Sequence, residues 1–369
     1  MKWIVAPDSF KNCLRSPQVA ALLAEGIREA SPGDTVVELP LADGGEGTVE
    51  AAARAAGGSI ASLSVSGPLG RPVEAHHALL PSGCAVLEMA EAAGLERLAE
   101  SERDPLRTTT CGVGEQVRAL LDAGIRDFVI GIGGSATVDG GLGLFQALGG
   151  VCRDAAGRRL PAGAGGGTLE EAASIDCSGL HAALGGARIR IASDVTNPLT
   201  GPRGAARVFA PQKGAGPAEV ERLERGLRRW AELWNDTGDS PGDGAAGGLG
   251  FLLRKLGGYS ESGAGLLLDL AGFDRHLDGT QWVVTGEGRT DFQSLDGKLC
   301  AVVAARAARK GVRTILCSGS LEPDFHAACF AGCFAIGSGP GPLQQAFEQT
   351  PANLRRMGRS LAGILKGNS

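Results

Sequence analysis

Residues 127–144 read DFVIGIGGSATVDGGLGL, and this stretch gives the clearest indication of the fold class. It begins as the apolar run Phe128–Ile132 and continues with small residues, with six glycines between Gly131 and Gly143 and one acid, Asp139. Glycine is used where a backbone turns sharply or another group comes close to it. A strand that ends in a glycine-rich turn before a helix can present its backbone N–H groups to an anion. The stretch therefore predicts an α/β sheet strand followed by a loop that binds phosphate or carboxylate.

Apolar runs alternate with helical patterns at both ends of the chain. Strands are predicted at 2–6 and 35–42, and again at 281–285, 313–317 and 334–336; helices are predicted from Ser16-Pro17 onward and at 47–56, 299–310 and 342–366. Proline at a first helical position after serine is a common helix start. Such alternation is typical of a parallel sheet with helices packed on it.

The middle of the chain has a different pattern. Residues 59–88 form three short runs separated by turn sequences, which predicts an antiparallel meander. Further on, helices are expected at 113–123 and 217–234 and a strand at 187–192. A chain of 369 residues is too long for one ordinary core. We predict a discontinuous domain of residues 1–65 and 285–369, with 66–284 inserted; two consecutive domains are the alternative.

Composition excludes several classes of protein. The net charge is −5 without any basic run, which argues against nucleic acid as a partner. No stretch approaches the roughly 18 apolar residues of a membrane span. The apolar stretch Trp3–Ala6 is too short for a signal peptide, so we expect a cytoplasmic protein. The nine cysteines are scattered without a CxxC pair, which indicates reduced thiols.

An acid follows each of five predicted strands. In open parallel sheets, ligands bind outside the carboxyl ends of the strands, so we expect these acids on one sheet edge. Any one alone is equally typical of a turn or a helix cap. Clustered acids need a cation between them, and Mg²⁺ is bound by one or two carboxylates together with substrate phosphates. The five acids are Asp8, Asp43, Asp139, Asp194 and Glu287.

Four basic residues lie in or near glycine-bearing loops: Lys11, Lys213, Arg289 and Lys298. Phosphoryl transfer needs such cations around the moving charge, together with a metal and an acid that aligns the acceptor. The P-loop motif is absent, so a different kind of phosphate site is implied. No histidine lies in a catalytic motif, and the absence of G-x-S-x-G argues against an esterase.

Two other classes of protein stay open at this point. Residues 131–136, GIGGSA, match the dinucleotide pattern G-x-G-x-x-A, with Asp154 near the distance of a ribose-binding acid. This would suit an NAD-dependent hydroxy-acid dehydrogenase, although Gly140, Gly141 and Gly143 interrupt the helix that should follow. The second alternative is a non-catalytic two-domain protein that closes on a small acid.

Six long blocks of the chain resemble the bacterial glycerate kinases of the type-1, glycerate 2-kinase family. They occur in the family's order from residue 4 to about residue 320: APDSFKNCLRS, LADGGEGTVEA, IGGSATVDGGLGLFQALG, SDVTNPLTGPRGAARVFAPQKGA, GDGAAGGLGF and VVTGEGRTDFQSLDGK. Cys13 and Val138 depart from the family pattern, where a small residue and asparagine are usual. Both stand beside the polar residues of the motifs and leave those unchanged.

The resemblance implies ATP-dependent phosphorylation of D-glycerate to 2-phosphoglycerate, with Mg²⁺ as the metal. The same reaction giving 3-phosphoglycerate is an alternative. The implied fold has two α/β domains, one a flavodoxin-like parallel three-layer domain and one with a mixed sheet, and the active site in the crevice between them. The resemblance leaves the oligomeric state open between monomer and homodimer.

We assign roles to the polar residues as a hypothesis. Asp194 is the first candidate for general base or metal ligand, and Asp43 is the second. Lys213 and Arg289 are expected to hold the substrate carboxylate or to stabilise the transferring phosphoryl group. The remaining candidates for binding substrate or phosphate are Asp8, Lys11, Gly44, Glu46, Gly133, Gly134, Ser135, Asp139, Thr196, Asn197, Glu287 and Lys298.

Overall fold

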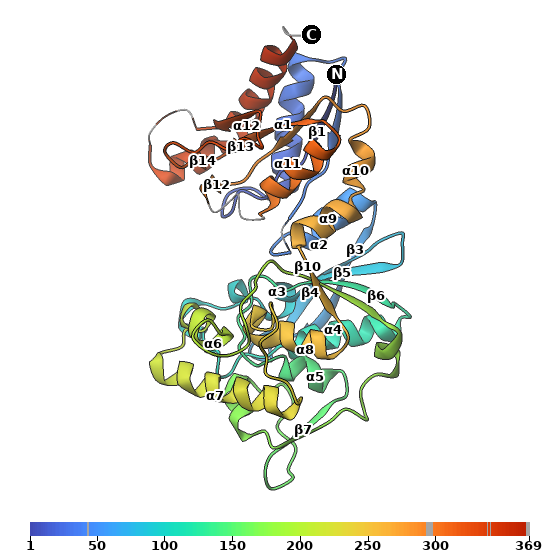
Figure 1. The fold of residues 1–369 in the computed structure, drawn as a ribbon, viewed down its shortest axis with the longest axis vertical. Coiled ribbons are helices and arrows are strands. Elements are labelled where there is room, and N and C mark those ends of the chain that lie inside the picture. Colours follow the sequence, from blue (N-terminus) through green and yellow to red (C-terminus); the bar gives the residue numbers. More distant parts are fainter. Residues whose placement is uncertain (43, 293–297, 338, 340, 367–369) are drawn as a thin grey trace. The chain divides into compact units, whose positions relative to one another are not determined.

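The computed structural model describes residues 1–42, 44–292, 298–337, 339 and 341–366 (Figure 1). Asp43, a predicted site residue, lies outside them. The contacts divide the chain into two compact units. Unit 1 comprises Met1–Asp43, Glu50–Gly58 and Ala264–Ser369, and unit 2 comprises Gly44–Val49 and Ser59–Gly263. The chain therefore crosses between the units more than once.

Unit 1 is built on a five-stranded sheet in the order β15-β13-β11-β1-β2. Its strands are β1 Lys2–Val5, β2 Thr35–Glu38, β11 Trp282–Thr285, β13 Arg313–Ser318 and β15 Gly332–Ala335. All neighbouring pairs are parallel. Counted along the chain within this unit, the order is 2-1-3-4-5, the flavodoxin-like order. The predicted flavodoxin-like parallel domain is confirmed.

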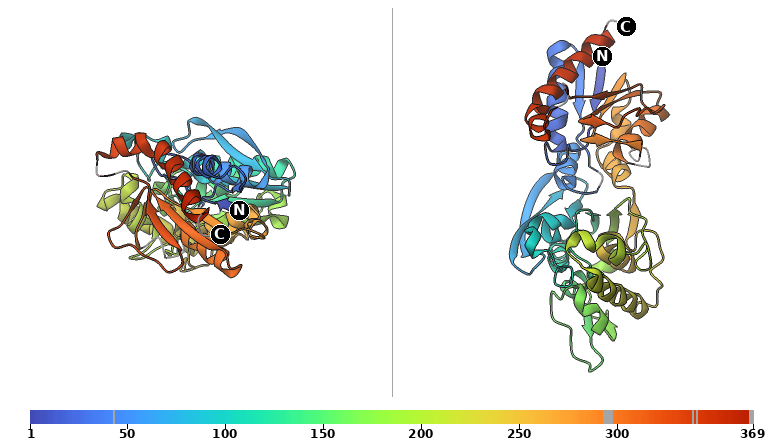
Figure 2. Two further views of the ribbon diagram at one scale, coloured as in Figure 1. Left: turned by 90° about the horizontal axis from the view of Figure 1, so that it is seen from above. Right: turned by 90° about the vertical axis from the view of Figure 1, so that its left-hand side faces the viewer.

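Helices cover both faces of this sheet. The helices α1 Ser16–Ala30 and α12 Leu343–Lys366 pack on one face, and α11 Leu299–Arg309 packs against β13 and β11 on the other. Figures 1 and 2 show α12 beside α1. A Cβ at Gly26 would lie 2.1 Å from the Arg355 carbonyl oxygen, so glycine permits this close contact. Successive side chains of a strand point to opposite faces of the sheet. In β13, Ile315 and Leu316 accordingly belong to two different hydrophobic cores.

Unit 2 is built on a six-stranded mixed sheet in the order β10-β9-β6-β5-β4-β3. The strands β3 Ser59–Ser66, β4 Pro72–Leu79 and β5 Cys84–Glu88 are antiparallel, as the meander prediction required. From β5 onward the pairs are parallel, through β6 Asp127–Gly131 and β9 Arg188–Ala192 to β10 Tyr259–Glu261. The predicted mixed-sheet domain is also confirmed.

The helices of unit 2 surround one large core. They are α3 Met89–Ala93, α4 Cys111–Asp122, α5 Leu142–Ala147, α6 Ala205–Phe209, α7 Pro217–Leu233 and α8 Leu249–Lys255. In this core Trp230 of α7 packs edge-on against Phe145, with ring centroids 5.8 Å apart. A small antiparallel pair, β7 Val151–Arg153 and β8 Ser174–Asp176, lies outside the main sheet. In the part of the chain that the structure describes, no helix has the length and apolarity needed to span a membrane.

Three further α-helices and a strand pair complete the α-helices and strands of the described residues. The helix α2 Thr48–Ala56 begins in unit 2 and continues in unit 1. The helices α9 Gly263–Leu270 and α10 Phe273–His276 are held in unit 1 by Arg306 of α11, which donates to Asp269 and Asp274 at 2.6 Å each. Residues 264–284, which we assigned to the inserted domain, thus pack in unit 1. The strands β12 Arg289–Thr290 and β14 Ser320–Leu321 pair with each other.

The expectation of one shared sheet edge for the five acids is wrong. The strands that precede Asp8, Asp43 and Glu287 belong to the sheet of unit 1, whereas those that precede Asp139 and Asp194 belong to the sheet of unit 2. Periodicity identified these strands but carries no information on which strands pair, and so it could not separate the two sheets.

Candidate active site

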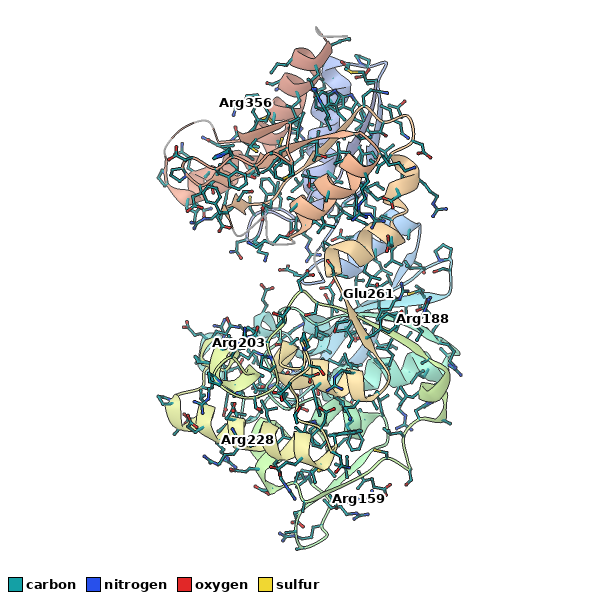
Figure 3. All side chains as sticks on the ribbon, viewed as in Figure 1. Arg159, Arg188, Arg203, Arg228, Glu261 and Arg356 are labelled. Atoms are coloured by element: carbon teal, nitrogen blue, oxygen red, sulfur yellow. The ribbon has the colours of Figure 1, made fainter. Side chains whose placement is uncertain are left out.

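Four strand ends of unit 2 form one edge of its sheet. Because β5, β6, β9 and β10 are mutually parallel neighbours, their carboxyl ends point the same way. They end at Glu88, Gly131, Ala192 and Glu261; Glu261 is labelled in Figure 3. Ligands of parallel sheets bind at such an edge. We call the residues that follow these strands, with Gly44–Val49 beside them, the unit 2 strand-end site.

The segment Gly44–Gly45 explains part of the glycine pattern. A Cβ at Gly131 would lie 2.5 Å from the Gly44 carbonyl oxygen, and one at Gly133 would lie 2.8 Å from the Gly45 Cα. Gly44 has φ +91° and its backbone packs against the Ala192 carbonyl group. The backbone of another segment therefore excludes side chains from these positions. Gly134, with φ +70°, is exposed in the same loop.

The later glycines of the loop also serve packing. Gly140 and Gly141 have positive φ and lie against the side chains of Trp230 and Leu252, and Trp230 Nε1 donates to the Gly140 carbonyl at 2.9 Å. A Cβ at Gly143 would lie 2.2 Å from the Thr109 hydroxyl oxygen. A ligand can thus account for the exposed part of the loop around Gly134, while the rest of the glycine pattern is required by the fold.

Lys213 lies beneath this loop and holds it from inside. Its side chain is only 1% exposed, and Nζ donates to Ser135 Oγ and to the Thr137 carbonyl, both at 2.7 Å. Burial lowers the pKa of Lys213 to about 7, an effect that the negative charge of Asp139 opposes. The structure brings Lys213 and Ser135 together, as the hypothesis of a shared site required.

Asp139 faces the interior of unit 2. It is 0% exposed, and its carboxylate accepts from Thr110 N, Thr110 Oγ1, Gly141 N and Gly143 N at 2.8–3.2 Å. Burial raises the pKa of Asp139, and the bonds from Thr110 act against that rise. These bonds fix the turn before α5. A contact between Asp139 and a ligand would require the carboxylate to leave them.

Glu88 is a buried acid that the sequence analysis missed. It ends β5, is 4% exposed, and accepts from Gly47 N at 3.1 Å and Val49 N at 2.7 Å. It therefore caps the start of α2 and anchors the loop that contains Gly44 and Glu46. Burial raises its pKa to about 7, and the charges of Glu91 and Glu46 add to the rise. Its signal in the sequence is an acid at the end of the fully buried run CAVLE.

The segment after β9 carries the first candidate base. Asp194 and Thr196 are exposed, and they follow directly on the end of the strand. Asn197 is held within its own loop. Its side-chain Nδ2 donates to the Arg203 carbonyl at 2.7 Å, and the backbone carbonyl of Asn197 accepts from Gly244 N. Ser193 N donates to the Glu261 carbonyl, which joins this segment to β10. Asp194 is thus an accessible carboxylate on a well-held strand end.

In unit 1 the predicted acids also lie at strand ends. Asp8 follows β1, where its N–H donates to the Gly286 carbonyl at 2.8 Å and Oδ1 accepts from Ser9 N. Glu287 follows the neighbouring strand β11, and Oε1 accepts from Thr290 Oγ1 at 3.0 Å. Both carboxyl groups are half-buried. Because β1 and β11 are parallel neighbours, these acids share one edge of the unit 1 sheet.

The predicted cations of unit 1 are more accessible. Lys11, Arg289 and Lys298 are all exposed, and Lys298 Nζ lies 3.8 Å from Asp291 Oδ1. Thr290 and Ser318, which we did not predict, connect this edge below the surface, with their hydroxyl oxygens 2.5 Å apart. A hydroxyl residue at a strand end has a weak sequence signal, because serine and threonine are common in turns.

The carboxylates of the described residues do not by themselves form a complete metal site. In the described residues no group of three or more His, Cys, Asp or Glu side chains could hold a metal. Magnesium, however, commonly uses one or two carboxylates and completes its shell with water and substrate phosphates. Asp194 offers such a carboxylate, whereas Asp43 lies outside the described residues.

Comparisons with known proteins agree on one family. A family model for the glycerate kinase family matches residues 3–366. The chain is 42% identical to a glycerate kinase from Bacillus subtilis (strain 168) and to a glycerate 2-kinase from Escherichia coli (strain K12), each over 99% of this chain and 98% of the relative. A solved structure described as a "putative glycerate kinase 2" from Salmonella typhimurium LT2 matches with a TM-score of 0.89 and 42% identity, covering 100% of this chain and 99% of that one.

Proposed function

The chain belongs to the glycerate kinase family, and we propose that it transfers the γ-phosphoryl group of ATP to the C2 hydroxyl of D-glycerate. The products would be 2-phosphoglycerate and ADP, with Mg²⁺ as the metal. The observation that carries this proposal is 42% identity over 99% of the chain to a relative named glycerate 2-kinase. Transfer to the C3 hydroxyl, giving 3-phosphoglycerate, is the alternative within the same reaction class.

The unit 2 strand-end site would supply the base and part of the anion site. Asp194 is exposed at a strand end, where its carboxylate can accept the proton of the attacking hydroxyl or bind the metal. Mg²⁺ would neutralise charge on the transferring phosphoryl group, and the Asp194 carboxylate would help to hold it. The backbone N–H groups of Gly133 and Gly134 and the Ser135 hydroxyl would bind an anionic oxygen.

The unit 1 strand ends would supply cations. Lys11, Arg289 and Lys298 are exposed, and long flexible side chains of this kind can follow a phosphate or carboxylate as it binds. The half-buried acids Asp8 and Glu287 lie on the same sheet edge. Preorganised charges that match the developing charge of the transition state are the main catalytic resource in phosphoryl transfer.

The dehydrogenase alternative is not favoured. Family membership indicates a kinase, and Asp154 is held in the turn after β7, where it accepts from Ala156 N and Arg158 N and pairs with Arg158 Nε at 2.8 Å. The helix after the glycine loop, α5, has only six residues. We still predict a cytoplasmic location, and the protein is expected to be either a monomer or a homodimer.

A coupled assay for ADP release tests the proposal. The protein is incubated with ATP, Mg²⁺ and D-glycerate, with L-glycerate and EDTA as parallel controls. ADP release that depends on both D-glycerate and Mg²⁺ is expected. If ATP stays intact with D-glycerate while NADH changes the protein's intrinsic fluorescence, the kinase proposal is wrong and the dehydrogenase replaces it.

A further inference from the structure

The backbone around Lys213 leaves its side chain little freedom. Lys213 ends the short 3-10 helix Pro211–Lys213, where its N–H donates to the Ala210 carbonyl at 3.0 Å. The next residue, Gly214, has φ +98°, and a Cβ there would lie 2.2 Å from the Arg103 carbonyl oxygen. The side chain runs into the interior toward Ser135 and Thr137. Its ammonium group is therefore placed by the fold before any ligand binds.

The hydrogen bond between Lys213 and Ser135 has only one possible direction while the lysine is charged. An ammonium group has three donors and no acceptor, so Ser135 Oγ must accept from Nζ. The hydroxyl hydrogen of Ser135 is then left to donate elsewhere. Within the described ranges, Lys213 Nζ is the one hydrogen-bond partner of Ser135 Oγ. Ser135 is partly exposed, next to the exposed Gly134, so a ligand atom can reach the hydroxyl.

We propose that Lys213 is a positioning residue that acts through Ser135, fixing its hydroxyl as a donor to an anionic oxygen of the ligand. The oxygen belongs to a phosphate of ATP or to the carboxylate of D-glycerate, and naming these two ligands rests on the proposed function. Lys213 itself stays below the surface and does not contact the ligand, because its side chain is 1% exposed. This replaces the direct substrate contact predicted for it from the sequence.

The charges around Lys213 fit this role. The negative charge of buried Asp139 partly offsets the cost of burying the ammonium group, whereas Arg103 approaches the neighbouring Gly214 only with its backbone carbonyl and Cβ. Because burial lowers the pKa of Lys213 to about 7, its protonation state can change near neutral pH. A neutral amine can accept from Ser135, and the hydroxyl would then turn inward.

A double-mutant cycle measures whether Lys213 acts through Ser135. KM and kcat are determined at about pH 6.5 for ATP and for D-glycerate, in the wild type, S135A, K213M and the double variant. Hydrogen bonds to charged groups contribute enough for S135A to raise the KM of one ligand about 10- to 100-fold, with kcat changed less than about threefold. K213M should cause a similar rise, and K213M in the S135A background should add less than about twofold.

The ligand whose KM rises identifies the anion. A rise for ATP assigns the hydroxyl to a phosphate, and a rise for D-glycerate assigns it to the carboxylate. Ser62→Ala, the same chemical change on the exposed part of β3, is the matched control and should leave both KM values unchanged. Unchanged KM values for both ligands in S135A overturn the inference, even if K213M does not fold. Additive effects of the two substitutions also overturn the inference, because they would show that Lys213 does not act through Ser135.

Failure of the proposed function would look different. If the wild type releases no ADP with D-glycerate, the kinase proposal fails first, and binding of MgATP and of inorganic phosphate is then measured by calorimetry on the same four proteins. Weaker binding of either probe to S135A, without further loss in the double variant, would still support the role of Lys213. If all four proteins bind each probe with the same affinity, the proposed role of Lys213 is wrong.

Discussion

The two units differ in how deeply they bury the acids that follow their strands. In unit 2, Glu88 and Asp139 are buried, and each carboxylate accepts from backbone N–H groups. In unit 1, Asp8 and Glu287 remain half-buried, and the Glu287 carboxyl accepts from a threonine hydroxyl. Asp194 of unit 2 is the exception within its own sheet, since it is exposed. An acid after a strand is therefore not necessarily a ligand group.

In unit 2, buried charged side chains hold the backbone of the glycine loop and of the segment before α2. In the proposed site, the exposed groups of the same unit would bind the ligand. Loss of a buried charge should reduce stability, because its partners are left unpaired in a low-dielectric interior. Loss of an exposed acid should reduce turnover and leave stability intact. The predictions below test this division.

The largest effect is expected at Asp194. Asp194→Asn keeps the size of the side chain and removes its charge, so turnover of D-glycerate should fall by roughly 10²–10⁴-fold. The free energy of unfolding, from urea denaturation, should stay within about 0.5 kcal/mol of wild type because the residue is exposed. Near-normal turnover would remove Asp194 from the mechanism.

Asp139→Asn should mainly destabilise the protein. The new amide turns one hydrogen-bond acceptor into a donor that faces the N–H groups of Gly141, Gly143 or Thr110. The expected loss is about 3 kcal/mol of unfolding free energy, measured by urea denaturation. If the variant keeps wild-type stability but loses activity, Asp139 contacts the ligand, and the distinction between buried and exposed acids does not hold.

Glu88 should give stability a measurable pH dependence. Its folded-state pKa of about 7 lies above the ordinary value of 4.5, so the folded protein holds a proton that the unfolded chain releases between these values. Stability from this group is full below about pH 4.5 and is lost as pH rises through about 7, a change of about 3 kcal/mol. Glu88→Gln should remove this part of the slope. Urea denaturation at about pH 5 and about pH 8 measures it, and an unchanged slope in the variant would exclude Glu88 as its source.

The smallest effect is expected at Arg289. It is exposed on β12, so Arg289→Gln should leave the free energy of unfolding unchanged. Loss of one charge that contacts an anionic ligand should raise KM by about tenfold. Steady-state kinetics with ATP and with D-glycerate would show which ligand it contacts. Arg309→Gln, at an exposed arginine near the end of α11 in the same unit, is the matched control.

Much of the fold could be predicted from the sequence. Hydrophobic periodicity identified the strands of the unit 1 sheet and all those of the unit 2 sheet except β10, and the change of pattern at residues 59–88 predicted the meander. Strand pairing could not be predicted this way, because it joins segments that are far apart in the sequence, such as β1 and β11. The burial of individual acids could not be predicted from the sequence either. Asp139 and Asp194 both follow strands beside small or polar residues, yet Asp139 is buried in the folded chain and Asp194 is exposed.

The product of the reaction tests the central claim most directly. Phosphorus-31 NMR of the protein with MgATP and D-glycerate should show a new phosphate monoester signal that is absent when EDTA is added. Coupling to the single proton on C2 should split this signal into a doublet, which identifies 2-phosphoglycerate. A triplet would mean transfer to the C3 hydroxyl, and no new signal with intact ATP would contradict glycerate as the substrate.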